Sequence, residues 1–327
     1  MVCLMVLVGG TTRLTGSGLS MVEWQPLMGA IPPIGEAQWH EVFDKYKQSP
    51  QYQEVNTWMQ LSDFKRIFFW EYIHRLLGRS VGLVFALPWI FFVLRKRLTT
   101  RLRRRTFVAF VLGGLQGLLG WYMVKSGLVD IPKVSHLRLA AHLSLALLLG
   151  MYVLWIILDL LPLAAERRQA RPNAGLRNGA IGLVILTGIQ IVWGAFMAGS
   201  HAGYMFRSFP LMDGHLIAPG SFTQGGFFTS MVMDPLTIHT IHRWFAYVVV
   251  AAVLVFAFRA RGFIDTPHRK GSLAFLLTIL GVQFLLGVFT VLLSVPTALG
   301  VAHQFGGLLL LAAAVMTTHA FSDSKNH

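Results

Sequence analysis

The sequence is poor in cysteine and in charged residues. Cys3 is the only cysteine among 327 residues, so no intrachain disulfide is possible. Charged residues make up 13% of the chain and hydrophobic residues 54%, a balance outside the range of soluble globular domains. The composition therefore excludes an ordinary soluble enzyme and predicts an integral membrane protein.

Apolar residues are grouped into runs of about 20, the length that a helix needs to cross the hydrocarbon core of a bilayer. We predict spans at residues 67–94, 106–125, 137–161, 178–199, 236–258, 272–294 and 298–320. The apolar start, residues 1–10, is half a span long, and no basic segment or small-residue cleavage site marks it as a signal peptide. We expect a first helix that lacks its beginning. The fold class is then an all-α polytopic membrane protein of eight helices, built as two pseudo-symmetric four-helix bundles.

Acidic residues are few, 14 against 28 Lys and Arg, and the basic excess is concentrated in short connections. Fifteen of the 28 lie at residues 95–105, 167–177 and 259–270. In an alternating topology all three connections fall on one side, and such a bias is typical of the cytoplasmic side. We therefore predict a multi-pass protein of the cell inner membrane, with segments 13–66 and 199–235 in the periplasm. The net charge of +14 does not indicate a nucleic-acid partner, because no soluble domain presents it.

Two halves of the sequence follow one plan. Ile-His-Arg occurs at residues 73–75 and again at 241–243, and Gln-x-x-x-Gly occurs in LQGLLG, IQIVWG and VQFLLG. The general composition of membrane helices does not easily produce such motifs in the same order, which favours an internal duplication. We predict one four-helix half at residues 1–165 and a second at 166–327. The glycines suit close helix packing in lipid.

Four histidines occupy matching places, each just inside the start of an apolar run. His74 and His142 are 68 residues apart in the first half, and His242 and His303 are 61 apart in the second. A rise of about 1.5 Å per residue places all four roughly 8–10 Å below the outer surface. Imidazole in a membrane helix is costly without a partner, and two facing imidazoles can ligate haem iron from both sides. We predict one bis-histidine haem site per half, rather than four histidines bonded to neighbouring backbone.

Other side chains near these histidines are weaker candidates. Arg75 and Arg243 directly follow their histidines, and Arg matches carboxylate geometry, so both are candidates for binding haem propionates. The alternative is that they snorkel to lipid headgroups. His136 and His239 lie one or two turns outside the ligands and could contact propionates or protons. Zinc is disfavoured, because no Cys or carboxylate completes a tetrahedral set in the second half.

The two halves differ at one place. Glu71 lies three residues before His74, whereas His239 holds the same position before His242. A spacing of three puts both side chains on one helix face, and a carboxylate on the bundle side of a membrane helix is a functional candidate. The alternative is that Glu71 only pairs with Arg75 or lies at the wet interface. We predict that the first half performs chemistry and that the second holds a resident haem.

Several segments together carry a family resemblance: GGTTRLTGSGLSMVEWQPLMGAIPP at residues 9–33, EYIHRLLGR at 71–79, and the shorter AAH, IHRWFAY and VAHQFGG. With them the chain resembles the haem A synthase family along nearly its whole length. Some bacterial members carry a redox-active cysteine pair in the first outer loop. Segment 13–66 contains no cysteine, so the chain resembles the proteobacterial and mitochondrial branch.

The resemblance implies oxidation of the methyl at ring position 8 of haem O to a formyl group, which gives haem A for cytochrome c oxidase. It implies that His74 and His142 hold the substrate haem, that His242 and His303 ligate a fixed haem b, and that Glu71 is catalytic. The implied partners are haem O, haem O synthase, cytochrome oxidase assembly factors, an electron-transfer partner and membrane lipid. A homo-oligomer and the oxygen source stay open.

Two other functions account for part of the pattern. A di-haem membrane cytochrome b that only carries electrons explains the four histidines, but neither Glu71 nor the motif at residues 9–33. A haem or solute transporter would predict interrupted helices around a midplane site, whereas these histidines lie near one surface.

Overall fold

The computed structural model describes residues 1–23, 28–128 and 132–322. It divides into two compact units, Met1–Leu145 and Ala146–His327. Residues 24–27 of the motif at 9–33 lie outside the described residues. The boundary of the sequence duplication at 165/166 stays a prediction, because compactness does not test it.

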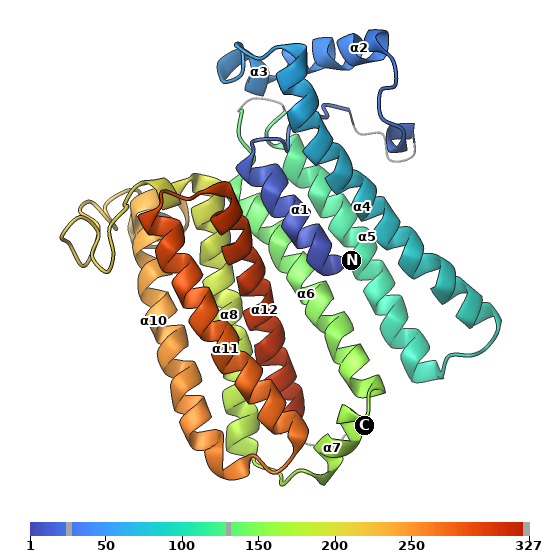
Figure 1. Cartoon of the computed structure of the whole chain (residues 1–327), viewed down its shortest axis with the longest axis vertical. Helices are drawn as coiled ribbons and strands as arrows, with labels where there is room; N and C mark the ends of the chain where they lie inside the picture. The colour runs from blue at the N-terminus through green and yellow to red at the C-terminus, as the bar shows by residue number, and fades with distance from the viewer. Residues whose placement is uncertain (24–27, 129–131, 323–327) are drawn as a thin grey trace. The chain divides into compact units, whose positions relative to one another are not determined.

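All the secondary-structure elements described in the first unit are helices (Figure 1). Its elements are α1 (Val2–Leu14), η1 (Met28–Ala30), α2 (Glu36–Lys47), α3 (Pro50–Glu54), α4 (Leu61–Leu94), α5 (Thr100–Lys125) and the start of α6 (His136–Leu160). The short helix α1 packs along α4, and α2 packs on the amino-terminal end of α4.

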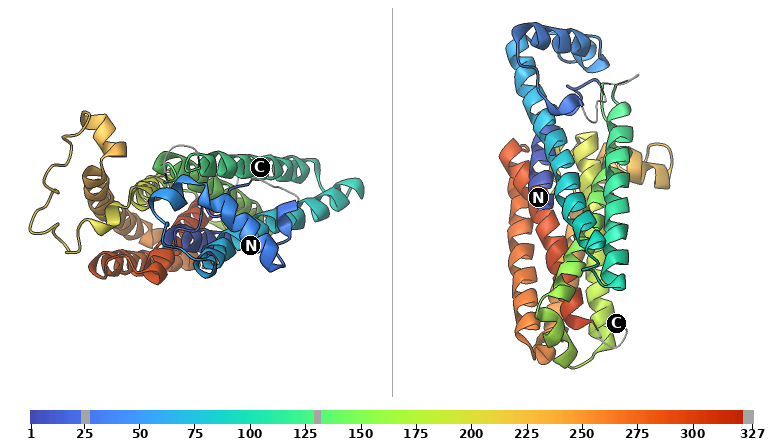
Figure 2. Two further views of the ribbon diagram at one scale, coloured as in Figure 1. Left: turned by 90° about the horizontal axis from the view of Figure 1, so that it is seen from above. Right: turned by 90° about the vertical axis from the view of Figure 1, so that its right-hand side faces the viewer.

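The second unit contains the rest of α6 and a bundle of four long helices, which run side by side in both Figure 1 and Figure 2. Its other elements are α7 (Leu163–Gln169), α8 (Ala174–Ser200), η2 (Ala202–Tyr204), α9 (Phe227–Met233), α10 (Pro235–Ala260), η3 (Arg261–Phe263), α11 (Pro267–Leu292) and α12 (Thr297–Phe321). The helix α8 packs on α10 and α12, and α11 packs on α12. Buried Leu, Val, Ala and Phe side chains from these four helices form its core.

The predicted all-α membrane class is confirmed. Among the described residues, seven helices are long and apolar enough to cross a membrane, and each matches a predicted span. The thirteen-residue α1 is shorter than a span, as expected from its sequence. The main difference is at α4, which begins at Leu61 rather than residue 67. Its first turns carry charged side chains and are capped by Gln60, so hydropathy alone does not reveal them.

A small aromatic core holds the outer segment of the first unit together. Tyr46 is fully buried among Phe43, Phe64 and Phe68, where α2 meets α4. Its hydroxyl donates to Gln51, whose side-chain amide donates in turn to the main-chain carbonyl of Gly16. Burial raises the pKa of the Tyr46 hydroxyl. These contacts position residues 16–21, which lie against α4.

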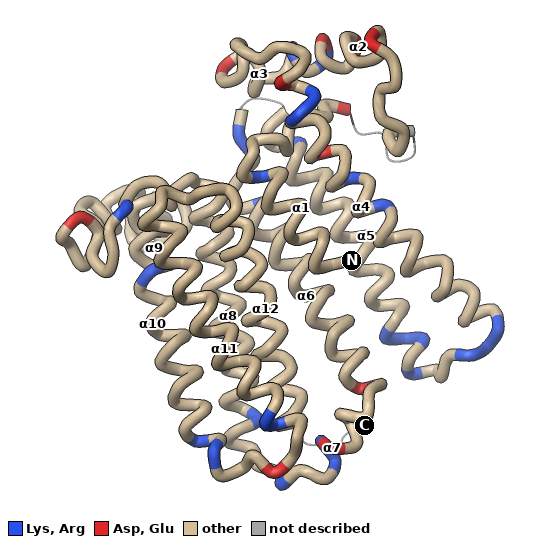
Figure 3. Tube along the Cα trace, in the orientation of Figure 1, with Lys and Arg blue, Asp and Glu red and all other residues tan. Residues whose placement is uncertain are grey.

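Charged side chains gather at helix ends and are sparse along the helices. In the first unit, Lys and Arg mark the turn between α4 and α5, and in the second they mark the ends of α10 and the start of α11 (Figure 3). This is the pattern expected of helices whose middle portions lie in hydrocarbon.

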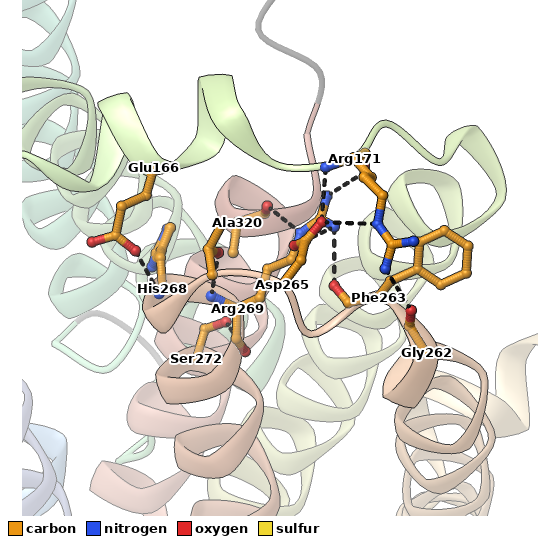
Figure 4. A network of polar contacts seen from close by, with 10 residues as sticks. Glu166, Arg171, Gly262, Phe263, Asp265, His268, Arg269, Ser272 and Ala320 are labelled. Carbon is orange, nitrogen blue, oxygen red and sulfur yellow. Dashed lines mark hydrogen bonds and ion pairs between the residues drawn. The ribbon is translucent and has the colours of Figure 1, made fainter.

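A polar network joins the charged helix ends of the second unit (Figure 4). Arg269, buried in the first turn of α11, donates to the main-chain carbonyls of Phe263, Arg171 and Ala320 and to the Asp265 carboxylate. Burial opposes ionisation of Asp265, but hydrogen bonds from Arg171 and the charge of Arg269 outweigh it, so the pKa of this carboxyl lies below its usual value. Arg269 thus supplies donors to carbonyls that helix ends leave without partners.

A second chain of contacts lies beside it. His268 Nε2 is 3.0 Å from His319 Nδ1, and His319 Nε2 is 3.2 Å from the Asp159 carboxylate, which also accepts from Arg167. Both imidazoles are buried. Each of these buried imidazoles therefore has a protein partner, and this series of contacts joins α6, α7, α11 and α12.

Candidate functional site

Each of the four predicted ligand histidines faces a glycine on the preceding long helix, or on α1 in the case of His74. A Cβ atom built on any of these glycines would lie only 2.9–3.1 Å from the imidazole. The pairs are His74 with Gly9, His142 with Gly120, His242 with Gly194, and His303 with Gly287. The absence of a side chain at these positions gives each ring its place between helices. The sequence analysis assigned such glycines to helix packing in general, and the structure gives them this particular role.

Three glutamines fix the backbone at three of these histidines. The side-chain amides of Gln116, Gln190 and Gln283 donate to the main-chain carbonyls of His142, His242 and His303 at 3.0, 2.9 and 3.0 Å. Each glutamine lies four residues before the glycine that faces the same ring, which explains the repeated Gln-x-x-x-Gly. The repeat was visible in the sequence, but the target of the amide was not.

In the second unit the two predicted ligands face each other. The ring centres of His242 and His303 are 6.4 Å apart and the rings are perpendicular. Two metal–nitrogen bonds of about 2 Å, plus about 1 Å from each nitrogen to its ring centre, span about 6 Å, so one metal ion fits between the rings. The Nδ1 atoms of both rings are buried without a hydrogen-bond partner. Such rings fit ligation through the other nitrogen.

The kind of metal site follows from the number of ligands. Within the part of the chain that the structure describes, no group of three or more His, Cys, Asp or Glu side chains could hold a metal ion. A protein zinc site needs three or four such ligands. Two opposed imidazoles suit instead a metal whose remaining positions are filled by a planar macrocycle, as in haem.

In the first unit, His74 lies on α4 and faces Gly9 of α1, and His142 lies on α6 and faces Gly120 of α5. The Glu71 carboxylate, three residues before His74 on α4, is buried and accepts from the Ser20 hydroxyl at 2.7 Å, from the Met21 amide at 2.8 Å and from the Arg75 guanidinium. A buried carboxylate with these donors is held as an ion pair.

Two partners of Glu71, Ser20 and Met21, belong to the segment SGLSM and lie about fifty residues away in sequence, so only the fold brings them to the carboxylate. Sequence reasoning missed them. Hydroxyl groups and main-chain amides carry no spacing signal of their own, so the only pointer was the motif at residues 9–33.

The two arginines contact the outer segments. Arg75 donates to the main-chain carbonyls of Met21 and Glu23 as well as to Glu71. Arg243 donates to the carbonyl of Ser208, and its Nη1 is buried without a hydrogen-bond partner among the described residues. Both side chains thus fasten loops, and the Nη1 of Arg243 is also available to an anionic group.

His239, which replaces Glu71 in the second unit, is completely buried. Its Nδ1 lies 2.8 Å from the Ala202 carbonyl and must donate, because a carbonyl only accepts. Its Nε2 has no hydrogen-bond partner in the described residues. His136 is the first residue of α6, one and a half turns before His142.

Comparison with known proteins identifies the family. Residues 1–315 match the family model described as "Cytochrome oxidase assembly protein". A protein named "Heme A synthase" from Nitrosospira multiformis is 45% identical over 318 residues, which cover 96% of this chain and 88% of the relative. Proteins of the same name from Flavobacterium johnsoniae and Agrobacterium fabrum are 41% and 44% identical, covering 98% and 97% of this chain and 94% and 86% of their own lengths. The chain therefore belongs to the cytochrome oxidase assembly protein family and, within it, to the haem A synthases.

Proposed function

We propose that this chain oxidises a methyl group of haem O to the formyl group of haem A in the first half, and that the second half holds a resident haem b. Membership of the haem A synthases makes it an oxidoreductase of the membrane. The observation that supports the division of labour is the buried carboxylate of Glu71, which accompanies only the first histidine pair.

The second half supplies two imidazoles whose separation one metal ion can span. Ligation by His242 and His303 would hold haem b, and a haem in that position can take up and pass on electrons. The buried Nη1 of Arg243 is a donor for a propionate. At the position that corresponds to Glu71 this half has His239 in place of a carboxylate, which fits electron transfer rather than chemistry on the macrocycle.

In the first half, His74 and His142 would hold the substrate haem by its iron and so fix which methyl approaches Glu71. Such positioning is itself a large part of catalysis. The Glu71 carboxylate can accept a proton from the reacting carbon or oxygen, or stabilise positive charge that develops there. Ser20, Met21 and Arg75 hold the carboxylate in place for that task.

The haem content of the purified protein tests this function. The full chain is expressed with and without a haem O synthase, and its haems are extracted and separated. We expect haem A or its hydroxylated precursor beside haem B only when haem O is supplied. Haem B alone in both preparations would make the chain a di-haem cytochrome b and would contradict the proposal.

The expected setting is the inner membrane, with the histidines toward the periplasm. Haem O would arrive from the synthase that makes it, and haem A would pass to factors that assemble cytochrome oxidase. An electron-transfer partner must remove the electrons that the oxidation releases.

The orientation predicts the outcome of a reporter fusion. Alkaline phosphatase joined after Arg103, in the basic connection between α4 and α5, should be inactive because this enzyme folds only in the periplasm and the connection is expected to be cytoplasmic. A fusion in the outer segment after Glu54 serves as the positive control. Strong phosphatase activity after Arg103 would invert the topology and place the histidines at the other face.

A further inference from the structure

Three glutamines in the structure each have one end bonded and the other end free of partners. The amide nitrogens of Gln116, Gln190 and Gln283 are bonded to histidine carbonyls, as described above. Their Oε1 atoms are all buried, and none has a hydrogen-bond partner among the described residues. A buried amide oxygen without a donor is costly, so three repeats of the same arrangement call for a missing donor.

The donor can come from the histidines themselves. The Nδ1 atoms of His242 and His303 are also buried and without partners among the described residues. In the first half, the Gln116 amide is in contact with the ring of His142, with its nitrogen 3.1 Å from Nδ1 and 3.3 Å from Nε2. A neutral imidazole that ligates a metal through one nitrogen carries its proton on the other, and this N–H almost always donates to an outer acceptor. Resting on the proposed haem sites, ligation through one ring nitrogen fixes the proton on the other, and each glutamine oxygen is the acceptor that this N–H would take.

We infer that Gln190 and Gln283, and Gln116 in the first half, are positioning residues that accept a hydrogen bond from the iron-ligating histidine, and that His74, which lacks such a glutamine, is the exchangeable ligand. Each amide bridges one histidine, donating to its carbonyl and accepting from its ring. The ring is thereby fixed in tautomer and orientation, and the accepted hydrogen bond makes it a stronger ligand.

The fourth position of the repeat is different. Four residues before Gly9 stands Met5, where the other three helices have glutamine. A thioether is at most a weak acceptor and donates nothing. Gly9 also faces the Nε2–Cδ2 edge of His74, whereas the other three glycines face the Cε1 atom of their histidines.

This asymmetry suits the two roles proposed for the two halves. A resident haem gains from two anchored ligands, and the second half has both. A substrate haem must bind and then leave as product. In the first half, His142 has a glutamine partner, whereas His74 has none. The haem of the first site would therefore be released on the side of His74, which lies on α4 and faces α1.

The second half can be tested by itself in a His74→Ala background, expressed without haem O synthase, so that haem B at His242 and His303 is the bound haem. Gln190→Glu, a stronger acceptor, should lower the midpoint potential of this haem, and Gln190→Met should raise it. Gln190→Met should also weaken haem retention about 10–100-fold, the usual effect of losing an outer partner. Thr187→Val is the control, since it removes another buried polar atom from α8 without touching the ligand.

A structural role alone would not give shifts of opposite sign. If both Gln190 variants move the potential in the same direction, or neither moves it relative to Thr187→Val, the glutamine does not act through the ligand ring and the inference is wrong.

The first half is tested by adding the missing anchor. In a His303→Ala background with haem B bound at the first site, haem is transferred to excess apomyoglobin and the rate is followed optically. Met5→Gln should slow this transfer by about 10-fold or more, while Met5→Leu, which changes the contact near Gly78 without an amide, should not. Equal rates in the two variants would overturn the assignment of His74.

Both measurements use haem B and no turnover. Failure of the chain to make haem A would therefore refute the proposed function and leave these results to decide the role of the glutamines separately.

Discussion

His242→Ala or His303→Ala is expected to remove haem b from the second half, so that the low-spin haem b spectrum loses the share of that site, and to stop haem A formation. Each substitution removes one of two opposed imidazoles whose ring centres are 6.4 Å apart, and so leaves the site with one of its two proposed ligands. The measurements are the reduced-minus-oxidised spectrum of the purified protein and the haem A content of membranes. His215→Ala, an exposed histidine in the outer segment of the same unit, should change neither.

A full haem b spectrum in both variants would remove the second half from the electron path. Loss of haem through misfolding is recognised with His303→Gly, in which added imidazole can enter the space left by the side chain and restore the spectrum.

Glu71→Gln is expected to leave haem bound and the protein in the membrane, but to cut haem O conversion by about 10²–10⁴, the usual cost of losing a proton-transfer group. The amide has nearly the same shape, and its oxygen can still accept from Ser20 and Met21. It can neither take a proton nor offset positive charge. The measurement is the fraction of haem A plus hydroxylated haem in membranes with equal amounts of variant and parent.

Ser20→Ala is the matched control for Glu71. It removes one donor from the same carboxylate and leaves the charge in place, so the rate should fall by only a few-fold. If Glu71→Gln works at the parental rate, the carboxylate has no part in the chemistry. If Ser20→Ala is as damaging as Glu71→Gln, the carboxylate acts by holding the outer segment.

Sequence patterns predicted the helices of this protein well because each membrane helix must satisfy its own backbone hydrogen bonds and present apolar side chains to lipid. All seven spans were found, and the lengthened start of α4 was missed because its first turns are polar. The alternating topology also predicted the facing of His242 and His303, since both lie just inside helices that start on the same side.

Contacts between distant polar groups were beyond prediction. The hydrogen bonds from Ser20 and Met21 to Glu71, and the pairing of His268 with His319, join residues about fifty positions apart that share no motif. Their partners are set by how helices and loops pack, and a hydroxyl or a carbonyl has many equivalent alternatives along the chain. The Gln-x-x-x-Gly repeat was predicted in part. The sequence showed that the motif recurs, but it did not show that the glutamine amide bonds to a histidine carbonyl.

The four glycines that face the histidines limit how this gene can change. Every base substitution that replaces a glycine codon with another amino acid adds a Cβ, and here that atom would press on an imidazole at 2.9–3.1 Å. A substitution at residue 120 or 287 forces a shift at the facing imidazole, and one at residue 9 or 194 requires it to give by a few tenths of an ångström, so all four positions are constrained while the histidine is retained. A lineage that gives up one haem site should lose the histidine first, and only then should the glycine begin to drift.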